Sequence, residues 1–164
     1  MINDIQGVRK EVLQSVSGLT DLQLNEKQAG KWSIMQVLEH LYLTEKLIVN
    51  KLKAVMASSE ETAAEDRPIH LVINRDHKIV APQFLTPSDD FITLATIQEK
   101  LLASRTSLEE FLADNDQEKL RKRSLLHPVF GLLNIKQWIE FIGLHEKRHL
   151  AQIEELKQEL GLRE

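Results

Sequence analysis

Hydrophobic residues recur at spacings of three and four in two segments of the first third of the chain, the period of an α-helix with one buried face. The apolar positions of the first segment are Ile5, Val8, Val12 and Val16. The second segment follows the stretch GKWSIMQ, where Ser33 and Gln36 have the spacing of a capping box. The pattern predicts helices over about residues 4–16 and 34–57, the first of them capped by Asn3.

The same period returns in the second half of the chain, where it predicts a third helix between about residues 87 and 113. Its inward positions are Leu94, Ile97, Leu101, Leu108 and Phe111. The start of this helix is ambiguous because Thr86, Ser88 and Thr96 are all residue types that cap helices.

A fourth helix is expected after Asn134, which repeats the capping-box spacing with Gln137. It extends to about Leu160, where Gly161 is a typical helix stop. Four amphipathic helices in a chain of this length predict an all-α protein with a single domain over residues 1–164.

About thirty residues, SSEETAAEDRPIHLVINRDHKIVAPQFLTP, separate the second and third helices. Antiparallel neighbours need only a few connecting residues, whereas an extended chain covers about 3.3 Å per residue and can return along a whole helix. The connection therefore allows the second and third helices to run parallel. VINRDHKIV could alternatively be a strand hairpin with Asn74 to His77 as its turn, but two strands alone have nothing to pair with, so we interpret it as an ordered loop.

The buried stripe of the fourth helix includes two histidines one helical turn apart. Its members are Trp138, Ile142, His145, His149, Gln152 and Leu156. Burying an imidazole without a partner costs on the order of 1–3 kcal/mol, so two adjacent buried rings need a shared explanation. Metal ligation would supply one, although an HxxxH spacing taken alone occurs by chance in many helices.

Composition narrows the possible chemistry. The formal net charge of −4 disfavours nucleic acid as a partner. No apolar run has the roughly 18 residues that a membrane span needs, and the first residues lack a signal-peptide layout, so a cytoplasmic location is expected. The chain has no cysteine, so a transition metal would take its ligands from His, Asp or Glu.

A third imidazole is available on the second helix, where His40 stands in KWSIMQVLEHL at the border of the apolar face. Periodicity alone leaves it either inward or on the surface. Tryptophan-serine at a helix start, a histidine eight positions after that tryptophan, HPVFGLLNIKQWIEF and finally HEKRHLAQI occur here in this order. Together they resemble the DinB-like (DinB/YfiT) family of four-helix-bundle metalloenzymes, over nearly the whole chain.

The resemblance implies a four-helix bundle of up-down-down-up topology with a long connection between helices two and three, in agreement with the length of that connection. It also implies a metal site built from one histidine on helix two and an HxxxH pair on helix four. The matching residues here are His40, His145 and His149. Nickel or zinc is the divalent ion most expected from the resemblance, although three neutral imidazoles also suit copper or iron.

Several members of the family are thiol transferases or hydrolases. With no cysteine in the chain, we expect the ion to activate a low-molecular-weight thiol for transfer to a small-molecule substrate. A metal-dependent hydrolase is one alternative, and a non-enzymatic binding or stress-response module with a structural metal or none is another. Bundles of this size often pair their helices, so a homodimer is expected.

Four further polar residues have a candidate role. His127 precedes a proline in the turn before the last helix, where closing the loop is favoured over a hydrogen bond near the site. His70 and His77 lie in the long connection and are expected to be exposed. Glu45 falls on the apolar face of the second helix, where pairing with Arg105 is favoured over contact with a metal-bound water.

Overall fold

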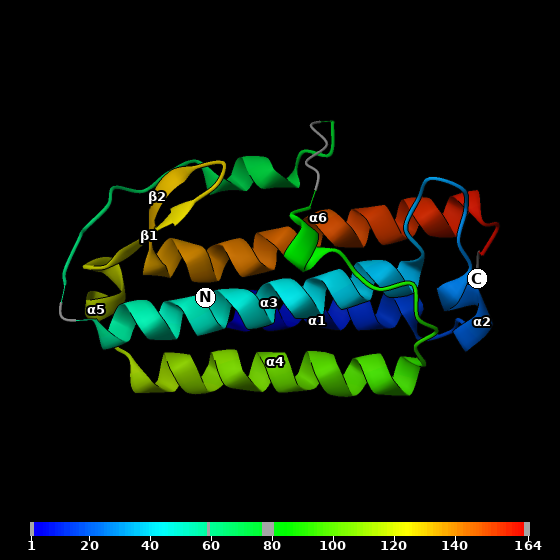
Figure 1. The fold of residues 1–164 in the computed structure, drawn as a ribbon, viewed down its shortest axis with the longest axis horizontal. Helices are drawn as coiled ribbons and strands as arrows, with labels where there is room; N and C mark the ends of the chain where they lie inside the picture. Colours follow the sequence, from blue (N-terminus) through cyan, green and yellow to red (C-terminus); the bar gives the residue numbers. More distant parts are fainter. Residues whose placement is uncertain (1, 59, 77–80, 163–164) are drawn as a thin grey trace.

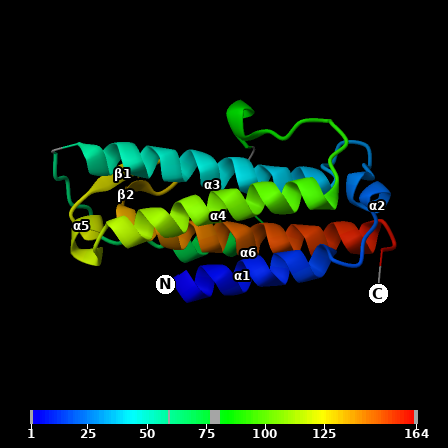
Figure 2. The same ribbon diagram turned by 90° about the horizontal axis from the view of Figure 1, so that it is seen from below.

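Four long helices form a bundle in the computed structural model, which describes residues 2–58, 60–76 and 81–162. They are α1 (Ile2–Val16), α3 (Ile34–Ala57), α4 (Leu94–Asp114) and α6 (Ile135–Glu159). Helices α1 and α6 run in one direction while α3 and α4 run in the other, which is the expected up-down-down-up topology (Figure 1; Figure 2). Helix α3 packs against both α4 and α6, and α1 packs against α6.

Shorter elements that the periodicity did not predict connect these helices. They are α2 (Asp21–Asn25), the 3-10 turns η1 (Ile69–Ile73) and η2 (Gln83–Leu85), α5 (Gln117–Arg121), and the strands β1 (Ser124–His127) and β2 (Gly131–Asn134). The strands form an antiparallel hairpin in which His127 pairs with Gly131. Two strands are marginal alone, and this hairpin lies against the first half of α6, which supports it (Figure 1).

The starts of α1 and α3 differ in how well the sequence predicted them. At α3, Ser33 Oγ accepts from the Gln36 N–H at 3.0 Å and Gln36 Oε1 accepts from the Ser33 N–H at 2.9 Å, so the predicted capping box is confirmed. Helix α1 begins at Ile2, before the predicted start. Asn3 is therefore inside the first turn, and its prediction as the cap was wrong.

Helix α4 begins later than predicted, and none of the three candidate residues caps it. Thr93 is the cap, and its side chain accepts from the N–H of Thr96 at 3.2 Å. The reason is tertiary: the Leu94 N–H donates to Asp21 Oδ1 of α2 at 2.8 Å. The helix therefore starts where its first residue docks on α2.

At α6 the predicted Asn134 cap is confirmed, but the second hydrogen bond of the predicted capping box, from Gln137 back to Asn134, does not form. Asn134 Oδ1 accepts from the Gln137 N–H at 2.9 Å, while the Gln137 side chain bonds both the N–H (2.8 Å) and the C=O (2.9 Å) of Arg67. Gln137 thus fastens the long connection to α6 instead of completing a capping box. Gly161 has a φ of 70° just after the helix, as expected for a C-terminal stop.

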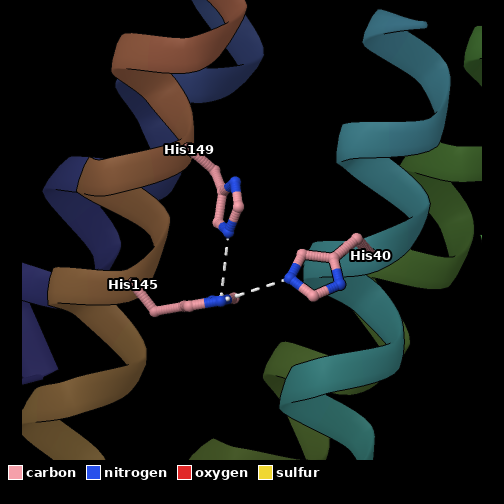
Figure 3. Close-up of side chains that lie close together, drawn as sticks. All are labelled: His40, His145 and His149. Atoms are coloured by element: carbon pink, nitrogen blue, oxygen red, sulfur yellow. Dashed lines mark hydrogen bonds between the residues drawn. The ribbon is translucent and has the colours of Figure 1, made fainter. Parts of the chain in front are cut away.

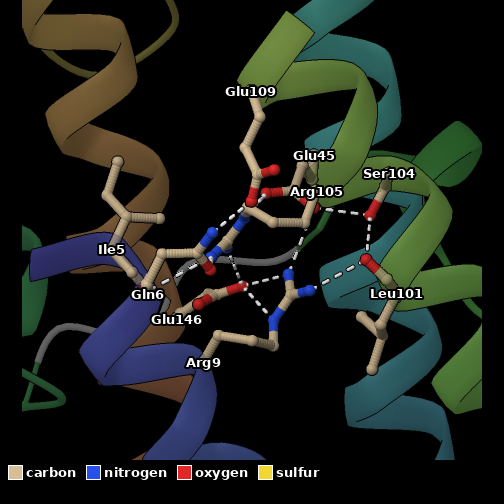
Figure 4. A network of polar contacts seen from close by, with 9 residues as sticks. All are labelled: Ile5, Gln6, Arg9, Glu45, Leu101, Ser104, Arg105, Glu109 and Glu146. Carbon is tan, nitrogen blue, oxygen red and sulfur yellow. Dashed lines mark hydrogen bonds and ion pairs between the residues drawn. The ribbon is translucent and has the colours of Figure 1, made fainter. Parts of the chain in front are cut away.

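A layer of charged side chains lies between two apolar clusters of the core, and Figure 4 shows this layer from close by. One residue of the layer comes from each long helix: Arg9, Glu45, Arg105 and Glu146. All four are at least 94% buried. The apolar cluster on one side includes Ile5, Ile48, Leu108 and Ile142, and the cluster on the other includes Val12, Leu41, Leu101 and Ile153.

The charges of this layer are paired across the bundle. Arg105 Nε donates to Glu45 Oε2 at 2.8 Å and its Nη2 donates to Glu146 Oε1 at 2.8 Å. Arg9 Nη2 donates to Glu45 Oε1 at 3.1 Å, and its Nε donates to Glu146 Oε1 at 2.9 Å. The predicted pairing of Glu45 with Arg105 is confirmed. Both Glu45 oxygens accept from these arginines, and Glu45 is not part of the cluster formed by His40, His145 and His149.

The long connection lies along α6 at η1 and along α3 at η2 (Figure 1). Arg148 of α6 holds η1 by donating to the carbonyls of Val72 (3.0 Å) and Asn74 (2.6 Å). No strand forms over residues 72–76, and His70 is exposed as predicted. His77, and with it the second half of the alternative hairpin, falls outside the described residues.

Among the helices of the described residues, none is both long enough and apolar enough to cross a membrane.

Candidate metal centre

Three imidazoles converge between the first third of α3 and the middle of α6 (Figure 3). His40 projects from α3, and His145 and His149 project from successive turns of α6. The Nε2 atom of His145 lies 3.3 Å from that of His40 and 3.1 Å from that of His149. All three residues predicted as metal ligands are thus brought together, with ligand atoms within 4.8 Å of one another.

A hydrogen bond at Nδ1 orients two of the three rings. His40 Nδ1 lies 2.9 Å from the carbonyl oxygen of Leu85, at the end of η2. His149 Nδ1 lies 2.7 Å from Gln152 Oε1, one turn further along α6. Both neighbours are acceptors, so each Nδ1 carries the ring hydrogen and each Nε2 offers a lone pair to the centre.

The three Nε2 atoms therefore face one another with at most one hydrogen between them, which only His145 can supply. One hydrogen cannot satisfy two lone pairs at good geometry, whereas one cation can. Ligands about 2.0–2.1 Å from a shared tetrahedral ion lie roughly 3.3–3.4 Å apart. The observed separations of 3.1 and 3.3 Å are close to that spacing, so the donor set fits a divalent transition metal.

Burial keeps these imidazoles neutral. His40 is 4% exposed and His149 is 9% exposed. Desolvation lowers the pKa of His40, although its bond to the Leu85 carbonyl acts in the opposite direction. Desolvation lowers the pKa of His149 to about 3 and that of His145 well below its usual value, in both cases with a further contribution from the neighbouring histidines. Neutral imidazole is the form that ligates metals, so the centre is ready for an ion near pH 7.

Aromatic rings flank the centre on two sides. The ring of Trp32, ahead of α3, lies 5.1 Å from that of His40. The ring of Phe141, one turn before His145 on α6, lies 5.6 Å from that of His145. Among the described residues no carboxylate joins the metal-ligating cluster. An ion held here would keep its full positive charge in apolar surroundings, where electrostatic interactions are strong.

His127 has the loop-closing role that was favoured, and it is also buried. Its Nδ1 accepts from the N–H groups of Val129 (3.0 Å) and Phe130 (3.3 Å), which closes the hairpin turn.

Gln152 is a residue whose role the sequence analysis missed. It was placed on the buried stripe, and its position three residues after His149 was the available signal for a supporting hydrogen bond.

The sequence matches the family model described as the DinB superfamily over residues 4–153. The chain belongs to the DinB superfamily. One similar protein is the uncharacterized protein YuaE of Bacillus subtilis (strain 168), which is 37% identical over 153 residues. That similarity covers 93% of this chain and 94% of YuaE.

Two solved structures share the fold of this DinB superfamily member. TT2238, a four-helix bundle protein, superposes with a TM-score of 0.66 and 20% identity, over 94% of this chain and 95% of TT2238. YfiT of Bacillus subtilis also gives a TM-score of 0.66 at 20% identity, over 99% of this chain and 86% of YfiT. YfiT is described as "a probable metal-dependent hydrolase with an unusual four-helix bundle topology". At this level of identity the similarity establishes the bundle alone.

Proposed function

We propose that the chain is a metal-dependent enzyme in which His40, His145 and His149 hold a divalent ion, zinc or nickel, that activates a small thiol or a water molecule. The observation that carries the proposal is the convergence of three Nε2 atoms with at most one hydrogen between them. An ion with three protein ligands and an open position supplies a Lewis acid that makes water or a thiol nucleophilic near neutral pH.

The protein's own residues prepare this chemistry by fixing and shielding the ligands. The Leu85 carbonyl and Gln152 hold His40 and His149 in the tautomer that ligates. Trp32 and Phe141 limit the water around the rings, which strengthens charge interactions at the centre. The chain contributes no thiol of its own, so a thiol nucleophile must be a co-substrate.

Thiol transfer and hydrolysis both follow from this centre. The absence of cysteine supports an external thiol as the nucleophile. The description of YfiT, which shares the fold, supports hydrolysis as the alternative reaction. The two reactions differ in whether turnover requires added thiol.

Metal content and turnover test the proposal together. Zinc- or nickel-loaded protein should bind one ion per chain and either hydrolyse para-nitrophenyl acetate or conjugate 2-mercaptoethanol to chlorodinitrobenzene. His149→Ala should abolish both metal binding and turnover while circular dichroism shows the bundle intact. Lys147→Ala, an exposed position on the same helix, should change neither. Stoichiometric metal without turnover in either assay would contradict the catalytic part and favour a structural or sensory metal site.

A further inference from the structure

His127 ends β1 with its ring inside the protein and a fixed hydrogen position. The residue is 6% exposed. Because Nδ1 accepts from the N–H groups of both Val129 and Phe130, it carries no hydrogen itself. The neutral ring must therefore hold its single hydrogen on Nε2, on the far edge of the ring from the turn. Burial lowers the pKa of His127 to about 4, so this neutral form is the one present near pH 7.

The ring of His127 borders the candidate metal centre. It lies edge-on to Phe141 with centroids 4.6 Å apart, and Phe141 in turn contacts the ring of His145. A single aromatic ring thus stands between His127 and a proposed metal ligand. The two imidazoles are close enough to interact electrostatically, since a proton on His127 would lower the pKa of His145.

The Nε2–H group of His127 is a donor that the fold does not use. Within residues 2–58, 60–76 and 81–162 it has no hydrogen-bond partner. The adjacent Trp138 differs, because its Nε1–H donates to the Leu125 carbonyl at 2.8 Å. This nitrogen is not one of the buried polar atoms that lack a partner, so it reaches solvent. A bound molecule that brings an acceptor can therefore replace water at this N–H.

We propose that His127 is a substrate-binding residue whose Nε2–H donates a hydrogen bond to an oxygen of the substrate bound at the three-histidine centre, while the apolar part of that substrate packs on Phe141. This inference rests on the function proposed above and extends it to the class of substrate. The preferred molecule carries a carbonyl or carboxylate oxygen next to an apolar or aromatic group. A neutral donor suits this position because a second positive charge beside the ion would weaken metal binding.

Two substitutions at His127 separate substrate binding from turn closure. In His127→Asn, the amide oxygen takes the place of Nδ1 and can still accept from the turn, but the Nε2–H donor is lost. In His127→Gln, the longer side chain places an amide N–H near the position of Nε2, but the acceptor for the turn is lost. The probe is benzoate, which combines a carboxylate with an aromatic ring, titrated calorimetrically into zinc-loaded protein.

If His127 binds substrate, His127→Asn should weaken the affinity for benzoate roughly tenfold or more, while the affinity for zinc stays unchanged. His127→Gln should keep benzoate affinity within a few-fold although its melting temperature falls. The reverse order, with Asn equal to wild type and Gln impaired, would assign His127 to turn closure alone and overturn the inference. Wild-type protein that binds zinc but not benzoate would overturn it as well.

A second measurement does not depend on turnover, and its first part needs no metal. Nitrogen chemical shifts of the His127 ring in the metal-free protein should show the hydrogen on Nε2, and addition of benzoate to the zinc-loaded protein should shift that resonance. A hydrogen on Nδ1 would overturn the inference directly. Failure of wild-type protein to bind zinc would instead overturn the function proposed above, and this inference with it.

Discussion

The hydrogen bonds at Nδ1 decide what the imidazoles of the centre can do. A ring free to rotate would present either nitrogen, whereas His40 and His149 are each held in one orientation by an acceptor. The two acceptors differ in kind, because one is the backbone carbonyl of Leu85 and the other is the side chain of Gln152. Only the Gln152 contact can be removed by substitution without altering the backbone.

Gln152→Leu should therefore weaken zinc binding about 10- to 100-fold, since loss of an outer partner of a metal-ligating histidine typically has an effect of that size. Gln152→Glu keeps the acceptor and should retain zinc affinity. Competition with a chromogenic chelator measures both. Gln158→Leu, at an exposed position of the same helix, is the matched control, and equal affinities for the Gln152 and Gln158 leucine variants would contradict the supporting role.

The charged layer joins all four long helices through buried ion pairs. Each arginine bridges the glutamates of α3 and α6, the two helices that supply the histidines. Glu146 directly follows His145 in the sequence. Burial raises the pKa of Glu146, while Arg9 and Arg105 act against that rise. The guanidinium groups therefore favour the charged form of this carboxylate against the effect of burial, next to the turn of α6 that carries a proposed ligand.

Arg105→Met should lower the free energy of unfolding by about 3–5 kcal/mol, because removal of one partner leaves buried charge uncompensated. Urea unfolding followed by circular dichroism measures the loss. Arg121→Met, at an exposed position on α5, should stay within about 0.5 kcal/mol of wild type. A loss below about 1 kcal/mol at Arg105 would mean that Arg9 alone suffices to compensate both glutamates.

The sequence predicted the long helices and their caps at Ser33 and Asn134 because these signals are local. It did not place His40, which stands at the border of an apolar face and was assigned through family resemblance. Arg9 and Glu146 were missed because their pairing joins residues 137 positions apart. Taken alone, each is a charged residue on a helix, and such residues usually face solvent.

The cap of α4 and the hairpin β1–β2 were missed for a related reason. Thr93 is the cap because the next residue, Leu94, docks on α2. A local sequence pattern does not indicate this contact. The hairpin has four residues per strand, which is marginal for two strands alone, and it packs against α3 and α6. Both depend on contacts that exist only once the helices have assembled.

Buried neutral histidines couple the folding of the protein to pH. In the unfolded chain each imidazole titrates near pH 6.5, while in the folded protein the pKa falls to about 4 for His127 and about 3 for His149. The unfolded state therefore binds more protons as pH drops below about 6.5, and the folded state loses stability. Glu146, whose pKa is raised, has the opposite effect but is a single group.

The urea midpoint of chelator-treated protein should thus be lower at about pH 5 than at about pH 7.5. Zinc-loaded protein should be more stable than chelated protein at the higher pH, and the two should converge in acid as protons displace the ion. Unfolding curves recorded over this range measure both effects. Equal midpoints for chelated protein at the two pH values would show that the histidines titrate normally in the folded state.

His40 and His145 are 105 residues apart along a chain of 164. An ion shared by them would act as a reversible cross-link and close a loop that contains most of the polypeptide. A permanent cross-link over about a hundred residues removes roughly 4.7 kcal/mol of conformational entropy from the unfolded chain. In the unfolded chain only the HxxxH pair can bind the ion locally. Much of the protein's affinity for the ion therefore arises on folding, when the loop closes. Metal supply would then set how often the chain opens to proteases, and so its lifetime in the cell, independently of any turnover.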